Sequence, residues 1–165
     1  MKQRLFLVLA LLAITASMAA LLLLNRQSPA PALQLTLLDQ RQLALQDLRG
    51  KVVLVNFWAT SCSGCMAEMP DLTRIQNKYA AQGYQTVAIA MSYDQREFID
   101  TYQARAQLPF LISHDVSGSA AEAFGGVSLT PTTFLIDKEG KILQKYVGTP
   151  DMQELENRIG KALRI

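Results

Sequence analysis

Apolar residues after position 32 form short runs separated by turn residues, which is the pattern of strands packed in a sheet. Two runs, residues 52–58 and 86–91, are almost wholly apolar, as expected of strands buried on both faces of a parallel sheet. Polar turns at residues 39–41 and 137–140 predict one hairpin near each end of the domain. The predicted strands are residues 33–38, 42–46, 52–58, 86–91, 110–112, 133–136 and 141–147.

Between these runs, apolar residues recur at intervals of three and four, the spacing of one buried helical face. Residues 118–124 predict a further short helix, and the last helix begins with Thr149 as its cap and Pro150 in its first turn. The residues predicted to line buried helical faces are Met69, Leu72, Ile75, Tyr79, Phe98, Ile99, Tyr102, Ala106, Met152, Leu155, Ile159 and Leu163. Strands alternating with helices, then a hairpin and a helix, predict an α/β fold with a mixed central β-sheet flanked by helices.

The N-terminal segment, residues 1–26, has a different character. Residues 5–24 are 20 residues without a charge, enough for a helix of roughly 30 Å that crosses a bilayer. Lys2 and Arg4 precede this run, so the N-terminus is expected to stay in the cytoplasm. We therefore expect a single N-terminal transmembrane anchor in a bacterial inner membrane, with the domain facing the periplasm. The alternative is a signal segment cleaved near residues 17–19, which leaves the domain free in the periplasm.

Residues 27–32 alternate proline and alanine and predict an extended spacer, so the folded domain is expected at residues 33–165. Three of the 16 basic residues precede residue 27, and the rest of the chain carries 13 basic and 14 acidic side chains. This balance argues against a nucleic-acid partner, which requires a concentrated basic surface. Two cysteines exclude a disulfide-rich scaffold, and with the single His114 they cannot fill a four-ligand zinc site.

The two cysteines, Cys62 and Cys65, lie where the strand at residues 52–58 gives way to a helix. A thiol in the first helical turn faces unsatisfied backbone N–H groups and the positive end of the helix dipole. Both favour the thiolate and lower the pKa of Cys62 below the free value of about 8.5. Cys62 is thus the expected nucleophile and Cys65 the buried resolving thiol. A purely structural disulfide is the alternative, although a bridge that closes so short a loop stabilises a protein little.

Residues 56–70 and 129–137 together resemble the TlpA/ResA-like group of membrane-anchored thioredoxins, and the resemblance covers residues 33–165 and the anchor. It implies a thioredoxin-like fold in which Pro131 is a cis-proline facing the redox pair. It further implies that Trp58, Thr130 and Pro131 bind substrate, with backbone groups of Thr130 pairing with an extended segment. Pro70 matches the family proline that kinks the active-site helix.

Glu68 lies three residues after Cys65 and therefore shares its helical face. In the resembled group an acid at this position lies below the disulfide, where burial raises its pKa and lets it take the proton from Cys65. The alternative is an exposed glutamate that only complements the helix dipole. Asn56 stands where ordinary thioredoxins carry a buried aspartate, and Gly64 and Ser61 depart from the usual proline and tryptophan.

The expected function is a protein-disulfide reductase that keeps cysteines of exported client proteins reduced, with a redox disulfide in place of any cofactor. The resemblance implies apocytochrome c or other specific thiols as clients, and a membrane thiol reductase as electron donor. Two alternatives remain at this point: an oxidase or isomerase of the same fold, or a copper-binding assembly factor using Cys62, Cys65 and His114. For His114, a solvated loop position is the simpler interpretation.

Overall fold

The computed structural model describes Thr15 and residues 27–164. In chain order the elements are β1 (Gln34–Thr36), β2 (Gln42–Ala44), the 3-10 turn η1 (Leu45–Leu48), β3 (Val52–Trp58), α2 (Ser63–Tyr79), η2 (Ala80–Gln82), β4 (Tyr84–Ala90), α3 (Arg96–Ala106), β5 (Leu111–His114), α4 (Ser119–Ala123), β6 (Thr132–Ile136), β7 (Ile142–Val147) and α5 (Met152–Arg164). The strands form a five-stranded sheet of order β5-β4-β3-β6-β7 and a separate β1-β2 hairpin. Strands β3, β4 and β5 are parallel, whereas β6 and β7 are antiparallel additions, so the predicted mixed sheet is confirmed.

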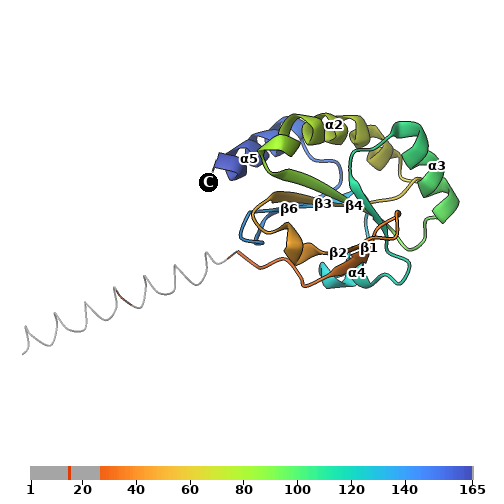
Figure 1. Ribbon diagram of the computed structural model, residues 1–165, viewed down its shortest axis with the longest axis horizontal. Coiled ribbons are helices and arrows are strands. Elements are labelled where there is room, and N and C mark those ends of the chain that lie inside the picture. The colour runs from red at the N-terminus through yellow and green to blue at the C-terminus, as the bar shows by residue number, and fades with distance from the viewer. Residues whose placement is uncertain (1–14, 16–26, 165) are drawn as a thin grey trace, which may run out of the picture.

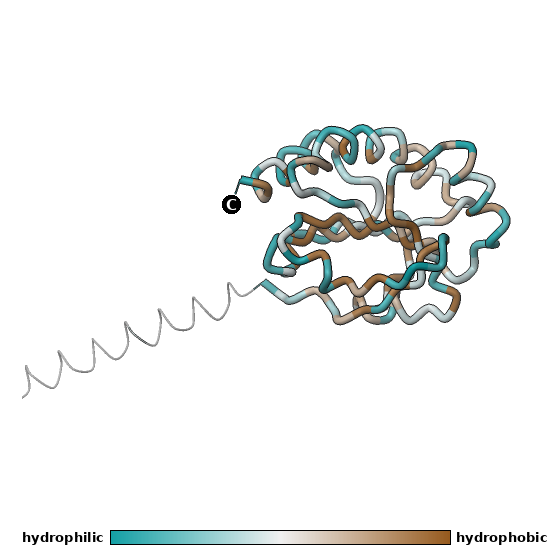
Figure 2. Tube along the Cα trace, in the orientation of Figure 1, coloured by the Kyte–Doolittle hydropathy of each residue, from teal (hydrophilic) through white to brown (hydrophobic). Residues whose placement is uncertain are grey.

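The sheet separates two layers (Figure 1). Helices α2, α3 and α5 cover one face, and the β1-β2 hairpin with α4 covers the other. All seven residues of β3 are buried, because alternate side chains enter the two cores. Leu54 and Trp58 pack toward the helical layer, while Val55 and Phe57 pack toward the hairpin and α4. The apolar strands therefore run through the middle of the molecule between more polar outer elements (Figure 2).

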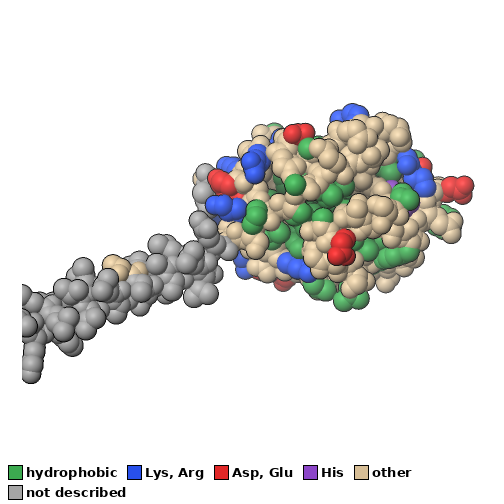
Figure 3. All heavy atoms as spheres, turned by 90° about the horizontal axis from the view of Figure 1, so that it is seen from below, with side chains coloured by type: hydrophobic (Ala, Val, Ile, Leu, Met, Phe, Trp, Pro, Cys, Tyr) green, Lys and Arg blue, Asp and Glu red, His purple; other side chains and the backbone are tan. Residues whose placement is uncertain are grey.

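The outer face on the hairpin side is mixed in character. Figure 3 shows apolar side chains in the middle of this face, with lysine, arginine and acidic side chains scattered around them. No concentrated basic surface is visible on this face, in keeping with the charge balance of the domain.

Three details of the predicted helices are wrong. Phe98 and Ala106 were expected on the buried face of α3 together with Ile99, but Phe98 is 54% exposed and Ala106 is exposed, whereas Ile99 is fully buried as predicted. Thr149 was expected to cap the last helix, but Asp151 does so, since its Oδ1 accepts a hydrogen bond from Glu154 N at 2.9 Å. The helix then begins two residues later than predicted, at Met152.

Residues 28–30 are hydrogen-bonded to the domain, where the sequence predicted a spacer. Ala30 N donates to Gly140 O at 2.8 Å, and Ile142 N donates to Ser28 O at 2.9 Å. Pro29 is thereby bridged to Lys141, the residue before β7. Within residues 27–164 none of the helices has the length and apolar character needed to cross a bilayer. The anchor predicted at residues 5–24 lies, except for Thr15, outside the described residues.

Candidate redox site

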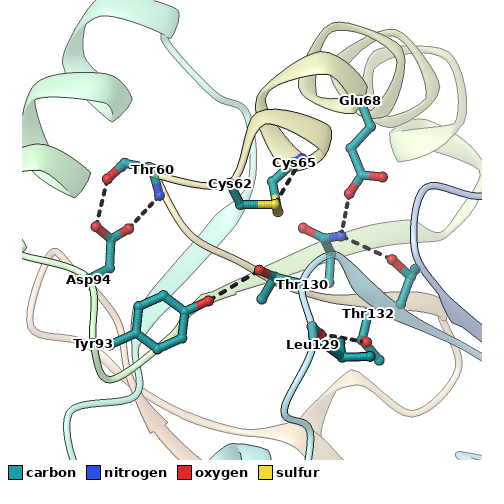
Figure 4. Close-up of a disulfide and its surroundings, with 11 residues drawn as sticks. Thr60, Cys62, Cys65, Glu68, Tyr93, Asp94, Leu129, Thr130 and Thr132 are labelled. Atoms are coloured by element: carbon teal, nitrogen blue, oxygen red, sulfur yellow. Dashed lines mark hydrogen bonds between the residues drawn. A yellow bond between two sulfur atoms is a disulfide. The ribbon is translucent and has the colours of Figure 1, made fainter.

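The two cysteines lie at the junction of β3 and α2, joined as a disulfide with a Cα–Cα distance of 5.2 Å. Cys62 is the residue that caps α2, and its Sγ accepts a hydrogen bond from Cys65 N at 3.1 Å (Figure 4). Cys62 is partly exposed, whereas Cys65 has no exposed surface. A partner thiolate or disulfide can therefore reach Cys62, and only Cys62 can reach Cys65 without a rearrangement. This is the asymmetry expected of a nucleophile and a resolving thiol.

The segment before β6 forms the opposite wall of the site. The Thr130–Pro131 peptide bond is cis, as the resemblance implied. Pro131 packs closely against the CxxC turn, because a Cβ on Gly64 would lie 3.5 Å from Pro131 Cδ and 3.2 Å from Thr149 Oγ1. The glycine at position 64 is therefore explained by its close neighbours. A Cβ here would make an ordinary contact with Pro131 but a tight one with Thr149 Oγ1, so the missing side chain lets the turn before α5 approach the CxxC turn.

Glu68 is buried beneath α2 with 2% of its surface exposed, so the alternative of an exposed glutamate is wrong. Its Oε1 accepts a hydrogen bond from Asn56 Nδ2 at 2.8 Å, and its Oε2 is buried without a hydrogen-bond partner. Burial raises the pKa of Glu68 to about 7, and the Asn56 hydrogen bond opposes this effect. A carboxyl group with this pKa can accept and release a proton near neutral pH.

The loop after β4 contacts both walls of the site, and sequence reasoning missed it. Asp94 accepts hydrogen bonds from Thr60 N and Thr60 Oγ1, both at 2.6 Å, just before Cys62. The hydroxyl of Tyr93 lies 3.1 Å from Thr130 Oγ1, just before Pro131 (Figure 4). The available signal was positional, since parallel β3 and β4 end at the same edge of the sheet, with Trp58 paired to Ala90.

Trp58 was predicted to bind substrate, and this prediction is wrong. The side chain is fully buried in the core below the site, with its ring centroid 5.8 Å from that of Tyr102. It has no surface with which to contact a partner. Its role is to fill the core where β3 ends, beneath the turn that carries Cys62.

His114 lies in β5 rather than in a solvated loop, and it is partly buried. It pairs with Ala90, which in turn pairs with Trp58, so two strand spacings of about 4.8 Å separate its backbone from the end of β3. Over residues 27–164, no three histidine, cysteine or acidic side chains come together as a set of metal ligands. The structure therefore does not assemble the copper site that Cys62, Cys65 and His114 were considered to form.

A mixed five-stranded sheet, a Cys-x-x-Cys disulfide at a helix N-terminus and a facing cis-proline define a thioredoxin-like thiol–disulfide oxidoreductase. Comparison with known proteins agrees. The Redoxin family model matches residues 25–163. The thiol-disulfide oxidoreductase ResA of Bacillus thuringiensis subsp. konkukian (strain 97-27) is 33% identical over 133 residues, covering 80% of this chain and 75% of ResA. The chain belongs to the Redoxin family and, within it, to the ResA-like thioredoxins.

Two further relatives support the same assignment. The thioredoxin-like protein YneN of Bacillus subtilis (strain 168) is 35% identical over 138 residues, covering 79% of this chain and 76% of YneN. The crystal structure of a thiol:disulfide interchange protein of the thioredoxin family from Chlorobium tepidum TLS superposes with a TM-score of 0.76 at 28% identity, covering 84% and 97% of the two chains. The chain is accordingly a thiol–disulfide oxidoreductase.

Proposed function

We propose that this oxidoreductase works as a reductant of exported client proteins, apocytochrome c among them, and is recharged by a membrane thiol reductase. The observation that carries the proposal is an accessible Cys62 joined to a fully buried Cys65, with the buried Glu68 carboxyl one helical turn later on α2. The resemblance to TlpA/ResA-like proteins supports the clients and the donor. The uncharged run at residues 5–24 supports an inner-membrane anchor with the domain in the periplasm.

The reaction begins from the reduced protein, with Cys62 as a thiolate at the N-terminus of α2. Cys62 Sγ attacks one sulfur of the client disulfide, forming a mixed disulfide and releasing the other client sulfur as a thiolate, which takes a proton from solvent. Cys65 then loses its proton and attacks Cys62 Sγ. The second client sulfur leaves and is protonated. Two electrons pass from the dithiol to the client, and the Cys62–Cys65 disulfide remains.

Glu68 is proposed to take the proton from Cys65 during the second step. The carboxyl lies one helical turn after Cys65 on α2, and its pKa of about 7 matches proton exchange near neutrality. The segment around Thr130 is proposed to pair with the client, because its backbone precedes the cis-proline that faces the disulfide.

Two cysteine variants test the assigned roles. We expect Cys62→Ser to abolish reduction of a peptide disulfide, since the accessible nucleophile is lost. We expect Cys65→Ser to react once and to accumulate a mixed disulfide, which non-reducing electrophoresis detects as a shifted band. Equal residual turnover in both variants would contradict the roles.

The direction of electron flow and the location each have a direct test. A reduction potential near about −270 mV supports a reductant, whereas a value near about −120 mV, the strongly oxidising end of the fold's range, means an oxidase instead.

The full chain is expected to sediment with membranes, and a fragment that begins at Gln27 is expected to remain soluble. A full chain that stays in the soluble periplasmic fraction would mean that the segment is cleaved.

A further inference from the structure

A row of polar side chains crosses the sheet beneath Glu68. Asn56 of β3 and Thr133 of β6 are direct partners in the antiparallel ladder, and Thr133 is in turn paired with Tyr146 of β7. Directly paired residues point to the same face of a sheet, which here is the face covered by α2. Asn56 is 0% exposed and Thr133 is 1% exposed, so this is a polar group within an otherwise apolar core.

The hydrogen bonds of this row determine how Asn56 is oriented. Asn56 Nδ2 donates one hydrogen bond to Glu68 Oε1 at 2.8 Å and a second to Thr133 Oγ1 at 3.0 Å. Both amide protons are therefore used, and the amide is fixed with its nitrogen toward the carboxyl. Glu68 Oε2 and Asn56 Oδ1 are buried, and neither has a partner among the described residues.

We propose that Asn56 is a positioning residue for Glu68: it holds Oε1 in both protonation states and leaves Oε2 to take up and release the proton. Thr133 fixes the Asn56 amide in the orientation this requires. An N–H group can donate to the carbonyl oxygen of a carboxylic acid as well as to a carboxylate, so the contact survives the change of state. This inference rests on the proposed role of Glu68 as proton acceptor and identifies the side chains that place it.

The chemistry of the donor matters as much as its position. A lysine in place of Asn56 would hold Glu68 ionised, whereas the neutral amide adds no charge and leaves the carboxyl able to protonate. The titratable group that shares the row is Tyr146, whose pKa burial raises, so it stays neutral when Glu68 titrates. Glu154 and Arg158 of α5 act on Tyr146 from the helical layer. The titratable side chains on β4 and β5 are Tyr84 of β4, whose pKa burial raises and which bonds Thr86, and His114 of β5, two strands away from β3.

The test follows the titration of Glu68 in the oxidised full chain, without turnover. The carboxyl carbon of Glu68 is observed by NMR in protein labelled with ¹³C-glutamate and assigned by its loss in Glu68→Gln. Removing the amide in Asn56→Leu is expected to raise the titration midpoint by about one pH unit, because the carboxylate loses its hydrogen bond. Thr133→Val is expected to shift the midpoint in the same direction by less, since the amide is then free to turn.

Thr86→Val is the matched control. Thr86 is a fully buried threonine of the neighbouring β4 that bonds Tyr84 and not Asn56. It should leave the Glu68 midpoint unchanged. An unchanged midpoint in folded Asn56→Leu would overturn the proposal, as would an equal shift in Thr86→Val. If Asn56→Leu does not fold, Thr133→Val decides, and a midpoint equal to that of the unsubstituted protein counts against the proposal.

This outcome is separable from the proposed function. The midpoint is measured with the disulfide intact, so it reports the placement of Glu68 whether or not Glu68 takes part in the reaction. If Glu68→Gln leaves the pH–rate profile of resolution unchanged, the proton-acceptor role fails while the Asn56 result stands. If the proton-acceptor role of Glu68 and the positioning role of Asn56 both hold, the pH–rate profile of Asn56→Leu should move to higher pH by the same amount as the Glu68 midpoint.

Discussion

Glu68 is a carboxyl group in the core of the domain, and its ionisation is coupled to folding. Its pKa is about 7 in the folded protein against 4.5 for an ordinary glutamate, so the folded state binds the proton more tightly. The stabilisation from this proton is complete below about pH 4.5 and is lost as the pH rises through about 7. The two values imply a loss of about 3 kcal/mol in the free energy of unfolding. Urea unfolding of the oxidised protein at several pH values between 4.5 and 8 measures it.

Glu68→Gln provides the comparison for this prediction. The variant cannot ionise at this position, so its unfolding free energy should change less across the same pH range, by about the 3 kcal/mol attributed to Glu68. Glu97→Gln, an exposed position in the first turn of α3, should behave like the unsubstituted protein. Parallel pH dependences in the unsubstituted protein and Glu68→Gln would show that folding does not raise the pKa of Glu68, and would contradict this prediction.

The loop between β4 and α3 is the element that connects the two walls of the redox site. Asp94 receives three hydrogen bonds, two from Thr60 and one from Gln95 N at 3.0 Å. Replacing Asp94 by alanine should lower the unfolding free energy by about 2 kcal/mol and leave the segment before Cys62 less well held. We expect the rate of peptide-disulfide reduction to fall on the order of 10-fold, because small displacements of a reacting group slow a reaction strongly.

Asp115 offers a matched control in the same fold. It is also a buried aspartate, and its carboxylate accepts hydrogen bonds from Ala120 N and Ala121 N at the start of α4. Asp115→Ala should cost a similar amount of stability and leave the reduction rate unchanged, because α4 lies on the opposite face of the sheet from α2. A rate that falls equally in both variants would indicate general loosening and not a specific role for Asp94.

The elements show what could be predicted from the sequence and what could not. Apolar runs predicted β3 and β4, and the CxxC spacing where β3 gives way to α2 predicted the disulfide, because these signals are local. The bonds of Tyr93 and Asp94 depend on which strands are neighbours, which no local pattern states. Phe98 and Ile99 were both placed on the buried face of α3, but adjacent residues of a helix differ by about 100° in direction, and only Ile99 faces the core.

For Trp58, the motif predicted a position next to the redox site but not how deeply the side chain is buried. The residue before a functional turn can lie on its surface or beneath it, and here the whole of β3 is buried. Burial of Glu68, by contrast, followed from its offset to Cys65 together with the resemblance. The cap of α5 was misplaced by two residues because Thr149 and Asp151 both offer a suitable oxygen, and only the path of the chain from β7 selects Asp151.

At the scale of the whole molecule, the chain enters the domain at the end opposite the disulfide. Residues 28–30 pair with the turn between β6 and β7, and this turn lies beside the start of β3, where Gly50 N donates to Lys138 O at 2.8 Å. The cysteines follow the other end of β3. The six steps from Val52 to Trp58 make the strand about 20 Å long, so the cysteines lie about that far from the turn between β6 and β7. A protein tethered through its N-terminal segment would therefore present Cys62 away from the tether.

A spin label tests this geometry. Attached at Gln27→Cys in a background of Cys62→Ser and Cys65→Ser, it should broaden amide signals near Gly140 strongly and those near Gly64 far less, since nitroxide relaxation falls steeply with distance. Ala30→Pro removes the N–H that donates to Gly140 O, so the contrast between the two ends should diminish in that variant. Equal broadening at both ends in the unsubstituted linker would mean that residues 28–30 do not stay bound to β7. The orientation of the redox pair relative to a membrane would then be set by a free tether, and a partner could meet Cys62 from any side.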